Sequence, residues 1–239
     1  MSEPFRSGHG WEHTGAFLCI GGALISADTQ QQTWRARWLL LALCAGALLV
    51  VTVTADLAWR GDLPSWEIEL FRWVNDLPDE LRDAMWLFMQ LGWIGAVAVV
   101  SVVAGVLTRK WIPAVSVASA GLITWLLAKE VKDAVERARP PAYLDDVNLH
   151  EGNGVGLGFP SGHAALAATM VTVLWPYCSR TLRVIAVTLA CVVALARVYF
   201  GVHLPLDVIG GAALGIVVGA LVRLALTWTP AYRASGEPQ

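Results

Sequence analysis

Two histidines and an aspartate stand at positions that suit nucleophilic or acid–base chemistry. His203 precedes Asp207 by four residues, and Pro205 between them is placed to begin a helix, so Asp207 falls in its first turn. A carboxylate behind an imidazole fixes the tautomer and makes the other ring nitrogen more nucleophilic. The alternative is a structural Asp–His pair at a membrane interface. Arg197 lies six residues before His203, a spacing that requires the chain to turn, and Gly201 permits the turn.

Two cations with helical spacing suit a multiply charged oxyanion. Lys132 and Arg139 are seven residues apart, about two helical turns, so they share a face if the helix continues that far. Pro140 and Pro141 then stop the helix.

The second histidine follows a Pro-Ser-Gly sequence that suits an anion site. Pro160-Ser161-Gly162-His163 comes after a Gly-rich loop, and we expect it to begin a helix. Ser161 is placed to cap that helix, Gly162 allows close approach to the backbone, and the free N–H groups of a helix start bind anions. His163 would point into the same place. The alternative for a histidine at a helix start is a solvated or capping residue.

The elements that carry these residues are transmembrane helices. The chain has 239 residues, 56% of them hydrophobic and 15% charged, with a net charge of −2 and a mean hydropathy of +0.56. This composition excludes a disordered chain, a collagen-like chain and a disulfide-rich secreted module, and its charge does not indicate a nucleic-acid partner. The four cysteines form no CxxC pair, so they predict no metal site and are interpreted as apolar packing residues.

We predict an all-α, polytopic membrane helical bundle of one domain, with six transmembrane helices. A span needs about 20 mostly apolar residues. The predicted spans are about 38–58, 84–108, 111–129, 163–179, 182–200 and 205–227. Residues 1–37 form a cytoplasmic segment and residues 229–239 a cytoplasmic tail, on either side of a membrane domain at 38–228. The apolar run at 14–26 is interpreted as a membrane-surface or loosely ordered segment, and the alternative is a cleaved signal peptide.

Short basic flanks predict the orientation of the bundle. Four clusters fall on one side, which places both termini in the cytoplasm; they are Arg35 with Arg37, Arg109 with Lys110, Arg180 with Arg183, and Arg223 with Arg233. The acidic loop from Asp56 to Asp83 then faces outward. Trp66, Leu70, Trp73 and Val74 recur there at helical spacing, which predicts either an amphipathic helix at the interface or an ordinary packed loop helix.

Several cations lie at the outward ends of the spans, against the positive-inside pattern. A Lys or Arg within the apolar slab costs about 2.5–3.5 kcal/mol, so such residues usually face a wet cavity. For Lys129 and Arg137 we expect the alternative, in which they reach the interface or pair with nearby acids: Glu130, Asp133 and Glu136.

The alternating spans predict that the three groups of candidate site residues meet at the outer face. These groups are Lys132 with Arg139, Ser161 to His163, and Arg197 with His203 and Asp207. The end of the third and fifth spans and the start of the fourth and sixth share that side; a wrong orientation would separate the clusters by about 30 Å. In the last span Gly211, Gly215 and Gly219 recur at four-residue intervals, which predicts close helix packing.

These residues resemble the type 2 phosphatidic acid phosphatase superfamily, membrane phosphatases that share a helical core with vanadium haloperoxidases. Its pattern of Lys, six residues, Arg-Pro matches Lys132 to Pro140, and its Pro-Ser-Gly-His matches Pro160 to His163. Its third part is Ser-Arg, five residues, His, three residues, Asp; here Ala196 replaces the serine before Arg197, which removes one hydroxyl. The resemblance covers about residues 84–227.

The resemblance implies a role for each motif residue. His203 would attack phosphorus to form a phosphohistidine, with Asp207 orienting it, and His163 would protonate the leaving oxygen. The phosphoryl oxygens would be held by Lys132, Arg139, Ser161, Gly162 and Arg197. No metal or other cofactor is expected.

The resemblance also implies a lipid phosphatase of the bacterial cytoplasmic membrane, with an extracytoplasmic active site. We expect a phosphomonoester or diphosphate of a lipid as substrate, with polyprenyl diphosphate favoured, and no protein partner. The alternatives are a phosphatidate or phosphatidylglycerol phosphate phosphatase, a lipid phosphotransferase, a haloperoxidase-type enzyme and a non-catalytic lipid-binding protein.

Overall fold

The structure is a computed structural model that describes residues 17–20 and 23–228. The chain divides into two compact units, Met1–Leu39 and Leu40–Gln239. In the first unit, strands β1 (Phe17–Ile20) and β2 (Ala23–Ser26) pair antiparallel, with Phe17 opposite Ser26. This hairpin occupies part of the apolar run at 14–26. The rest of that run and the predicted tail at 229–239 lie outside the described residues.

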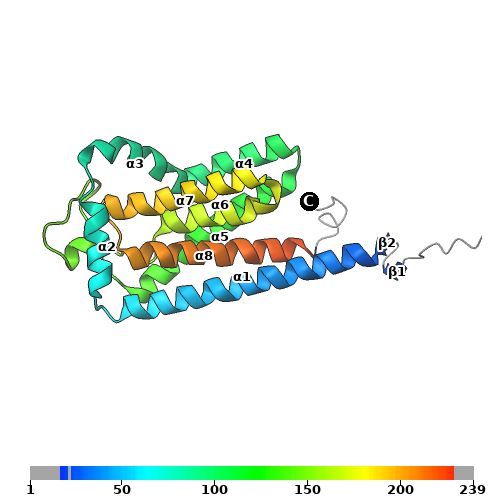
Figure 1. Cartoon of the computed structure of the whole chain (residues 1–239), viewed down its shortest axis with the longest axis horizontal. Coiled ribbons are helices and arrows are strands. Elements are labelled where there is room, and N and C mark those ends of the chain that lie inside the picture. The colour runs from blue at the N-terminus through cyan, green and yellow to red at the C-terminus, as the bar shows by residue number, and fades with distance from the viewer. Residues whose placement is uncertain (1–16, 21–22, 229–239) are drawn as a thin grey trace, which may run out of the picture. The chain divides into compact units, whose positions relative to one another are not determined.

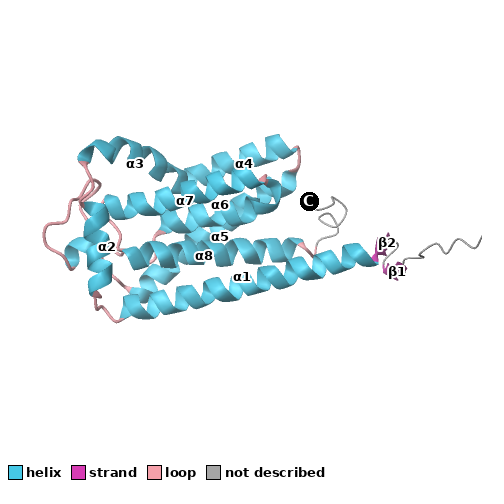
Figure 2. Cartoon of the chain, viewed as in Figure 1, coloured by secondary structure: helices cyan, strands magenta, loops and turns pink. Residues whose placement is uncertain are grey.

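The second unit is an all-α bundle, as predicted (Figure 2). Its helices begin with the continuation of α1 (Ala27–Trp59) and end with α8. The others are α2 (Ser65–Asn75), η1 (Asp79–Leu81), α3 (Arg82–Met89), η2 (Gln90–Gly92), α4 (Ile94–Thr108), α5 (Trp111–Val135), η3 (Pro140–Ala142), α6 (Gly162–Leu174), η4 (Trp175–Tyr177), α7 (Arg180–Tyr199) and α8 (Pro205–Leu226). Helices α4 to α8 run side by side, and α2 lies across the end at which α7 finishes and α8 starts (Figure 1). We call this the α2 end.

The described helices provide fewer candidate spans than the six predicted. Four are long and apolar enough to cross a membrane: Thr33–Trp59 within α1, α5, α7 and α8. A fifth is possible only if Asp79–Gly92 and Ile94–Thr108, which meet at a bend of 65°, form one span. Helix α6 has 13 residues, short of the roughly 20 that cross a hydrocarbon core. It is buried along most of its length among its neighbours, so protein rather than lipid satisfies its apolar surface.

Glycines bring α6 and α8 into close contact, as their spacing predicts. A Cβ at Gly211 would collide with the carbonyl oxygen of Ser161, and one at Gly215 with that of Ala165. A Cβ at Gly219 would lie 2.7 Å from Cβ of Thr172. Larger side chains would therefore push the helices apart. This contact holds the start of α6 beside the start of α8.

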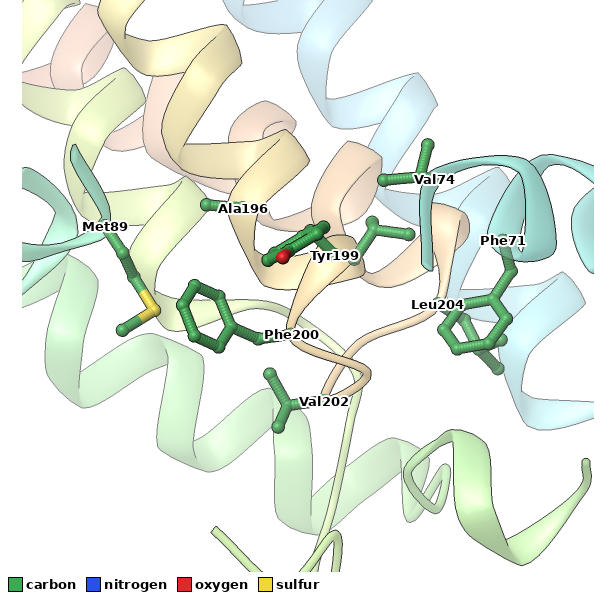
Figure 3. Close-up of a cluster of buried hydrophobic side chains, with 9 residues drawn as sticks. Phe71, Val74, Met89, Ala196, Tyr199, Phe200, Val202 and Leu204 are labelled. Atoms are coloured by element: carbon green, nitrogen blue, oxygen red, sulfur yellow. The ribbon is translucent and has the colours of Figure 1, made fainter. Parts of the chain in front are cut away.

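Helix α2 is packed into the bundle rather than resting on it. Phe71 and Val74 join a buried cluster built from α3, α7 and the turn after α7, with Met89, Ala196, Val198, Tyr199, Phe200, Val202 and Leu204 (Figure 3). Three of the residues predicted to form its apolar face, Trp66, Leu70 and Trp73, are exposed, which is the arrangement that the interfacial alternative predicts. Another face of the helix is buried in the bundle, and it includes two polar residues, Glu67 and Asn75.

Candidate active site

The cations Lys132 and Arg139 meet through a turn and not along one helix. Helix α5 ends at Val135, and Glu136 adopts a left-handed conformation with φ of 53°. The prediction that the helix continues to Pro140 is therefore wrong. Residues 137–139 are extended: Gly158 N–H donates to Arg137 O at 2.7 Å, and Arg139 N–H donates to Gly156 O at 3.2 Å.

This pairing also fixes the Lys132 ammonium group. Its Nζ donates to the carbonyls of Leu157 at 3.1 Å and Gly158 at 2.9 Å. An ammonium has three N–H donors, so one is left for a ligand. Gly158 is required here because a Cβ at that position would lie 2.7 Å from Oδ2 of Asp207.

The start of α6 presents polar groups without protein partners. Ser161 occupies the N-cap position and is fully buried, but its hydroxyl makes no capping hydrogen bond, contrary to the prediction. Its backbone N–H instead donates to the carbonyl of Asp207 at 2.8 Å. A Cβ at Gly162 would meet no atom within 4 Å. There is open space in front of this helix start, where backbone N–H groups favour an anion.

The turn between α7 and α8 places His203 beside Asp207. Gly201 has a φ of 70°, and Pro205 is the first residue of α8, both as predicted. Asp207 is buried and accepts from Leu204 N–H at 2.9 Å. Nδ1 of His203 lies 3.4 Å from Oδ2 of Asp207, in contact but without the alignment of a hydrogen bond.

The predicted site residues come together at the α2 end. Charge interactions link Lys132, Arg139, Arg197 and His203 with His163. Ser161 is tied to Asp207 through its backbone, and Gly162 follows it in the chain. All eight predicted residues thus belong to one cluster, drawn from the ends of α5 and α7 and the starts of α6 and α8.

Most buried polar atoms that lack a hydrogen-bond partner belong to this cluster. Within residues 17–20 and 23–228, five buried side-chain atoms have none: Arg139 Nε, His150 Nε2, Ser161 Oγ, Arg197 Nε and His203 Nδ1. Four of the five are in predicted site residues. Buried polar groups in proteins are nearly always paired. Because guanidinium and hydroxyl groups donate hydrogen bonds, a ligand with several acceptor oxygens fits them.

The environment of His203 favours its neutral form. Burial lowers the pKa of His203 well below its ordinary value, and the positive charges of Arg197, Lys132 and Arg139 lower that pKa further. The imidazole is therefore unprotonated at neutral pH, with a lone pair available for nucleophilic attack.

Arg197 is engaged on one edge by an acidic residue of the loop. Its Nη1 donates to Oε2 of Glu151 at 2.8 Å and contacts Sδ of Met89 at 2.8 Å. Glu151 is the first residue of the Gly-rich loop, which runs to Gly158, and it is partly exposed. Its carboxylate occupies a position that an oxyanion could take, while Nε of Arg197 has no partner.

Sequence reasoning misplaced one cation and missed one acid. The prediction that Arg137 reaches the interface or pairs with Glu130, Asp133 or Glu136 is wrong. Its side chain is 1% exposed and forms ion pairs with Glu67 and Asp207. Glu67 lies four residues before Phe71 and seven before Val74, in phase with the buried face of α2, and this phase was the available signal. Lys129, in contrast, is exposed with its ammonium over the Trp125 ring, as expected for an interfacial residue.

The described residues contain no group of three or more His, Cys, Asp or Glu side chains that could hold a metal ion. The positive charge at the site comes instead from lysine and arginine side chains.

Comparisons with known proteins agree with this architecture. The model of the PAP2 superfamily matches residues 109–230. Phosphatidylglycerophosphatase B of Bacillus subtilis is 37% identical over 109 residues, which cover 41% of this chain and 50% of that protein. Undecaprenyl-diphosphatase of Sulfolobus acidocaldarius is 26% identical over 74% of this chain and 85% of its own.

A solved structure has the same fold. The transmembrane PAP2-type phosphatidylglycerolphosphate phosphatase from Bacillus subtilis superposes with a TM-score of 0.63, covering 75% of this chain and 94% of its own at 22% identity. The matched family region holds every predicted site residue. This multi-pass membrane protein therefore belongs to the PAP2 superfamily of membrane lipid phosphatases.

Proposed function

We propose that this protein hydrolyses a phosphomonoester or diphosphate of a lipid through a phosphohistidine intermediate, with a polyprenyl diphosphate as the favoured substrate. The observation that carries the proposal is the set of buried, unpartnered donor atoms in Arg139, Ser161 and Arg197. A tetrahedral phosphoryl group offers acceptor oxygens to these donors, and the open space before Gly162 gives it room.

In the first chemical step the neutral His203 is the nucleophile. Its Nε2 lone pair forms a bond to phosphorus while the bond from phosphorus to the leaving oxygen breaks, and the electron pair of that bond goes to the oxygen. His163, protonated, gives its proton to the same oxygen. Burial, followed by the positive charges of its neighbours, lowers the pKa of His163 to about 3 in the free enzyme, so the negative charge of the bound phosphoryl group is what allows His163 to carry the proton.

The second step returns the enzyme to its starting state. A water oxygen bonds to phosphorus as the phosphorus–nitrogen bond breaks, and the electron pair of that bond returns to His203. His163 takes the proton from the water. Throughout, Lys132, Arg139 and Arg197 offset the charge on the phosphoryl oxygens, so the mechanism needs no metal ion.

Two considerations support the substrate and its side of the membrane, and a third favours another substrate. The Sulfolobus relative, matched over most of its length, is an undecaprenyl-diphosphatase. The basic pairs Arg109–Lys110 and Arg180–Arg183 lie at the end of the bundle opposite the site, and by the positive-inside rule this supports an extracytoplasmic site. The two Bacillus subtilis proteins described above instead favour phosphatidylglycerol phosphate, which is the second candidate substrate.

The test is phosphate release by the purified protein from a panel of lipids in the presence of EDTA. The panel holds undecaprenyl diphosphate, phosphatidate and phosphatidylglycerol phosphate. We expect the highest kcat/KM with the diphosphate. Release only after magnesium is restored would contradict the metal-free mechanism, and no release from any lipid would overturn the phosphatase proposal. Labelled acceptor lipids in the same assay distinguish hydrolysis from transfer to a second lipid.

A further inference from the structure

A buried chain of charges connects α2 to the proposed nucleophile. Nη1 of Arg137 lies between two carboxylates, 3.1 Å from Oε1 of Glu67 and 3.0 Å from Oδ1 of Asp207, and its Nη2 lies 2.7 Å from Oε2 of Glu67. The three side chains are 0–1% exposed. Glu67 therefore holds the guanidinium with two hydrogen bonds, a geometry that fixes its plane.

The same carboxylates hold the start of α8. Oε1 of Glu67 accepts from Leu206 N–H at 2.9 Å, and Oδ2 of Asp207 accepts from Leu204 N–H at 2.9 Å. Since Arg137 holds the other oxygen of Asp207, that carboxylate is fixed from both sides. The result is that its Oδ2 faces Nδ1 of His203.

We propose that Glu67 is a positioning residue for catalysis, acting through Arg137 to hold the Asp207 carboxylate against His203. The proposal rests on the proposed function of His203 as nucleophile. It extends the machinery beyond the family region at 109–230, because Glu67 belongs to α2. We call Glu67, Arg137 and Asp207 the carboxylate relay.

The charge of Glu67 matters as much as its shape. When His203 bonds to phosphorus its ring becomes positive, and the negative charge of Asp207 stabilises that form. Arg137 alone would neutralise Asp207. Because Glu67 neutralises Arg137, the relay keeps one net negative charge that faces His203.

Stability alone is a weak explanation for the relay. Replacing a buried ion network by apolar side chains of similar size is often neutral or stabilising. A double variant that replaces both Glu67 and Arg137 therefore separates an effect on catalysis from an effect on stability.

The experiment compares four variants with wild type: Glu67→Gln, Arg137→Met, the double variant Glu67→Met/Arg137→Met, and the control Asn75→Leu. Measured for each are kcat and KM on one lipid phosphate, the fraction folded, and the Kd of orthovanadate, a phosphate analogue. We expect Glu67→Gln to lower kcat about 10- to 100-fold, as loss of a supporting partner typically does, with KM within about twofold of wild type. Orthovanadate should bind about tenfold more weakly.

The double variant tests whether the two residues act as one unit. If they do, its kcat falls no further than that of Arg137→Met, because coupled residues are not additive. The folded fraction of the double variant should equal or exceed that of Arg137→Met. Losses that multiply would contradict a relay.

Asn75 is the matched control because it anchors the same helix without touching the relay. Its side chain is buried and donates to the carbonyls of Asn148 and Tyr199 at 2.9 Å each. We expect Asn75→Leu to lower stability but to leave kcat per folded molecule within about threefold. If Asn75→Leu lost as much kcat as Glu67→Gln, the acid would only dock α2 and the proposal would be wrong.

The vanadate measurement keeps the inference separate from the proposed function. If wild type binds orthovanadate but hydrolyses no lipid phosphate, the phosphatase proposal fails, and the ratio of Kd values between Glu67→Gln and Asn75→Leu still decides the relay. Equal Kd values in those two variants would overturn it, and so would a folded wild type that binds no orthovanadate.

Discussion

Arg137 and Arg139 are two residues apart, yet they belong to polar clusters with opposite properties. Arg137 forms buried ion pairs with two carboxylates, those of Glu67 and Asp207. Arg139 has a buried Nε without a partner and shares that property with groups of Ser161 and Arg197. A cluster that is complete without a ligand can hold other groups in place. A cluster with unused donors is suited to bind a ligand, so Arg137 serves positioning and Arg139 serves binding. We call the site residues with unpartnered atoms, Arg139, Ser161, Arg197 and His203, the open cluster.

The largest test removes the nucleophile from the open cluster. His203→Ala should lower kcat by about 10⁴-fold or more, as loss of a catalytic nucleophile does, while lipid binding is preserved. Phosphate release and lipid binding are measured in parallel. The control is Thr124→Val, which removes a buried hydrogen bond of 2.8 Å between α5 and α6 and should keep near-normal kcat. Retained rapid turnover in His203→Ala would exclude this residue as the nucleophile.

Next comes a cation of the open cluster compared with one outside it. Arg139→Gln should lower kcat/KM by about 10²- to 10³-fold, because it removes a preorganised positive charge from the transferring phosphoryl group. Lys129→Gln changes an exposed cation stacked on Trp125 and should have an effect below twofold. Steady-state kinetics on the same lipid phosphate measure both. Similar losses in the two variants would show that bulk positive charge, and not the open cluster, determines the rate.

The open cluster should also make folding sensitive to acid. Because the pKa of His203 is lowered in the folded protein, the unfolded chain takes up a proton below about pH 6.5 that the folded protein does not. The free energy of unfolding should therefore fall with decreasing pH, by up to about 1.4 kcal/mol per unit from this group. This contribution is fully present above pH 6.5. Thermal unfolding of wild type and His203→Asn between pH 7 and pH 5 measures it, and equal slopes would contradict the burial of a neutral imidazole.

The smallest expected effect concerns Glu151, which pairs with Arg197 on the open side. Glu151→Gln removes the negative charge that competes for the guanidinium, so KM for a lipid phosphate should fall about two- to fivefold, the range of a partly exposed charge pair. The pair is screened by salt, so the difference between variant and wild type should shrink at 1 M NaCl. A higher KM in the variant would mean that Glu151 supports substrate binding instead.

Local signals in the sequence were sufficient for much of this architecture. Pro205 signals a helix start and Gly201 a turn, and neither signal depends on the rest of the chain. Both residues act in the structure as the sequence predicts. The glycines of α8 likewise predict its close contact with another helix. Such features depend on backbone sterics within a few residues.

Features set by contacts across the chain were not predictable in the same way. Helix α5 stops at Val135 because residues 137–139 pair with the loop before α6, and no residue near 135 signals this. Arg137 pairs with Glu67, 70 residues away, although acids closer in sequence were the expected partners. Helix α6, in contrast, stops at Leu174 before a 3₁₀ turn that contains Pro176, a local signal that the predicted span at 163–179 ran through.

The position of Glu67 sets the smallest piece of this chain that should work. A fragment trimmed to the matched family region at 109–230 would retain both imidazoles and the phosphate-binding cations, and all of its motifs would be intact. In that fragment, however, the buried guanidinium of Arg137 would lose Glu67 and keep Asp207 as its ion-pair partner. Engineering or transplanting this catalytic core therefore requires the short helix α2, which lies across the end of the bundle that holds the site.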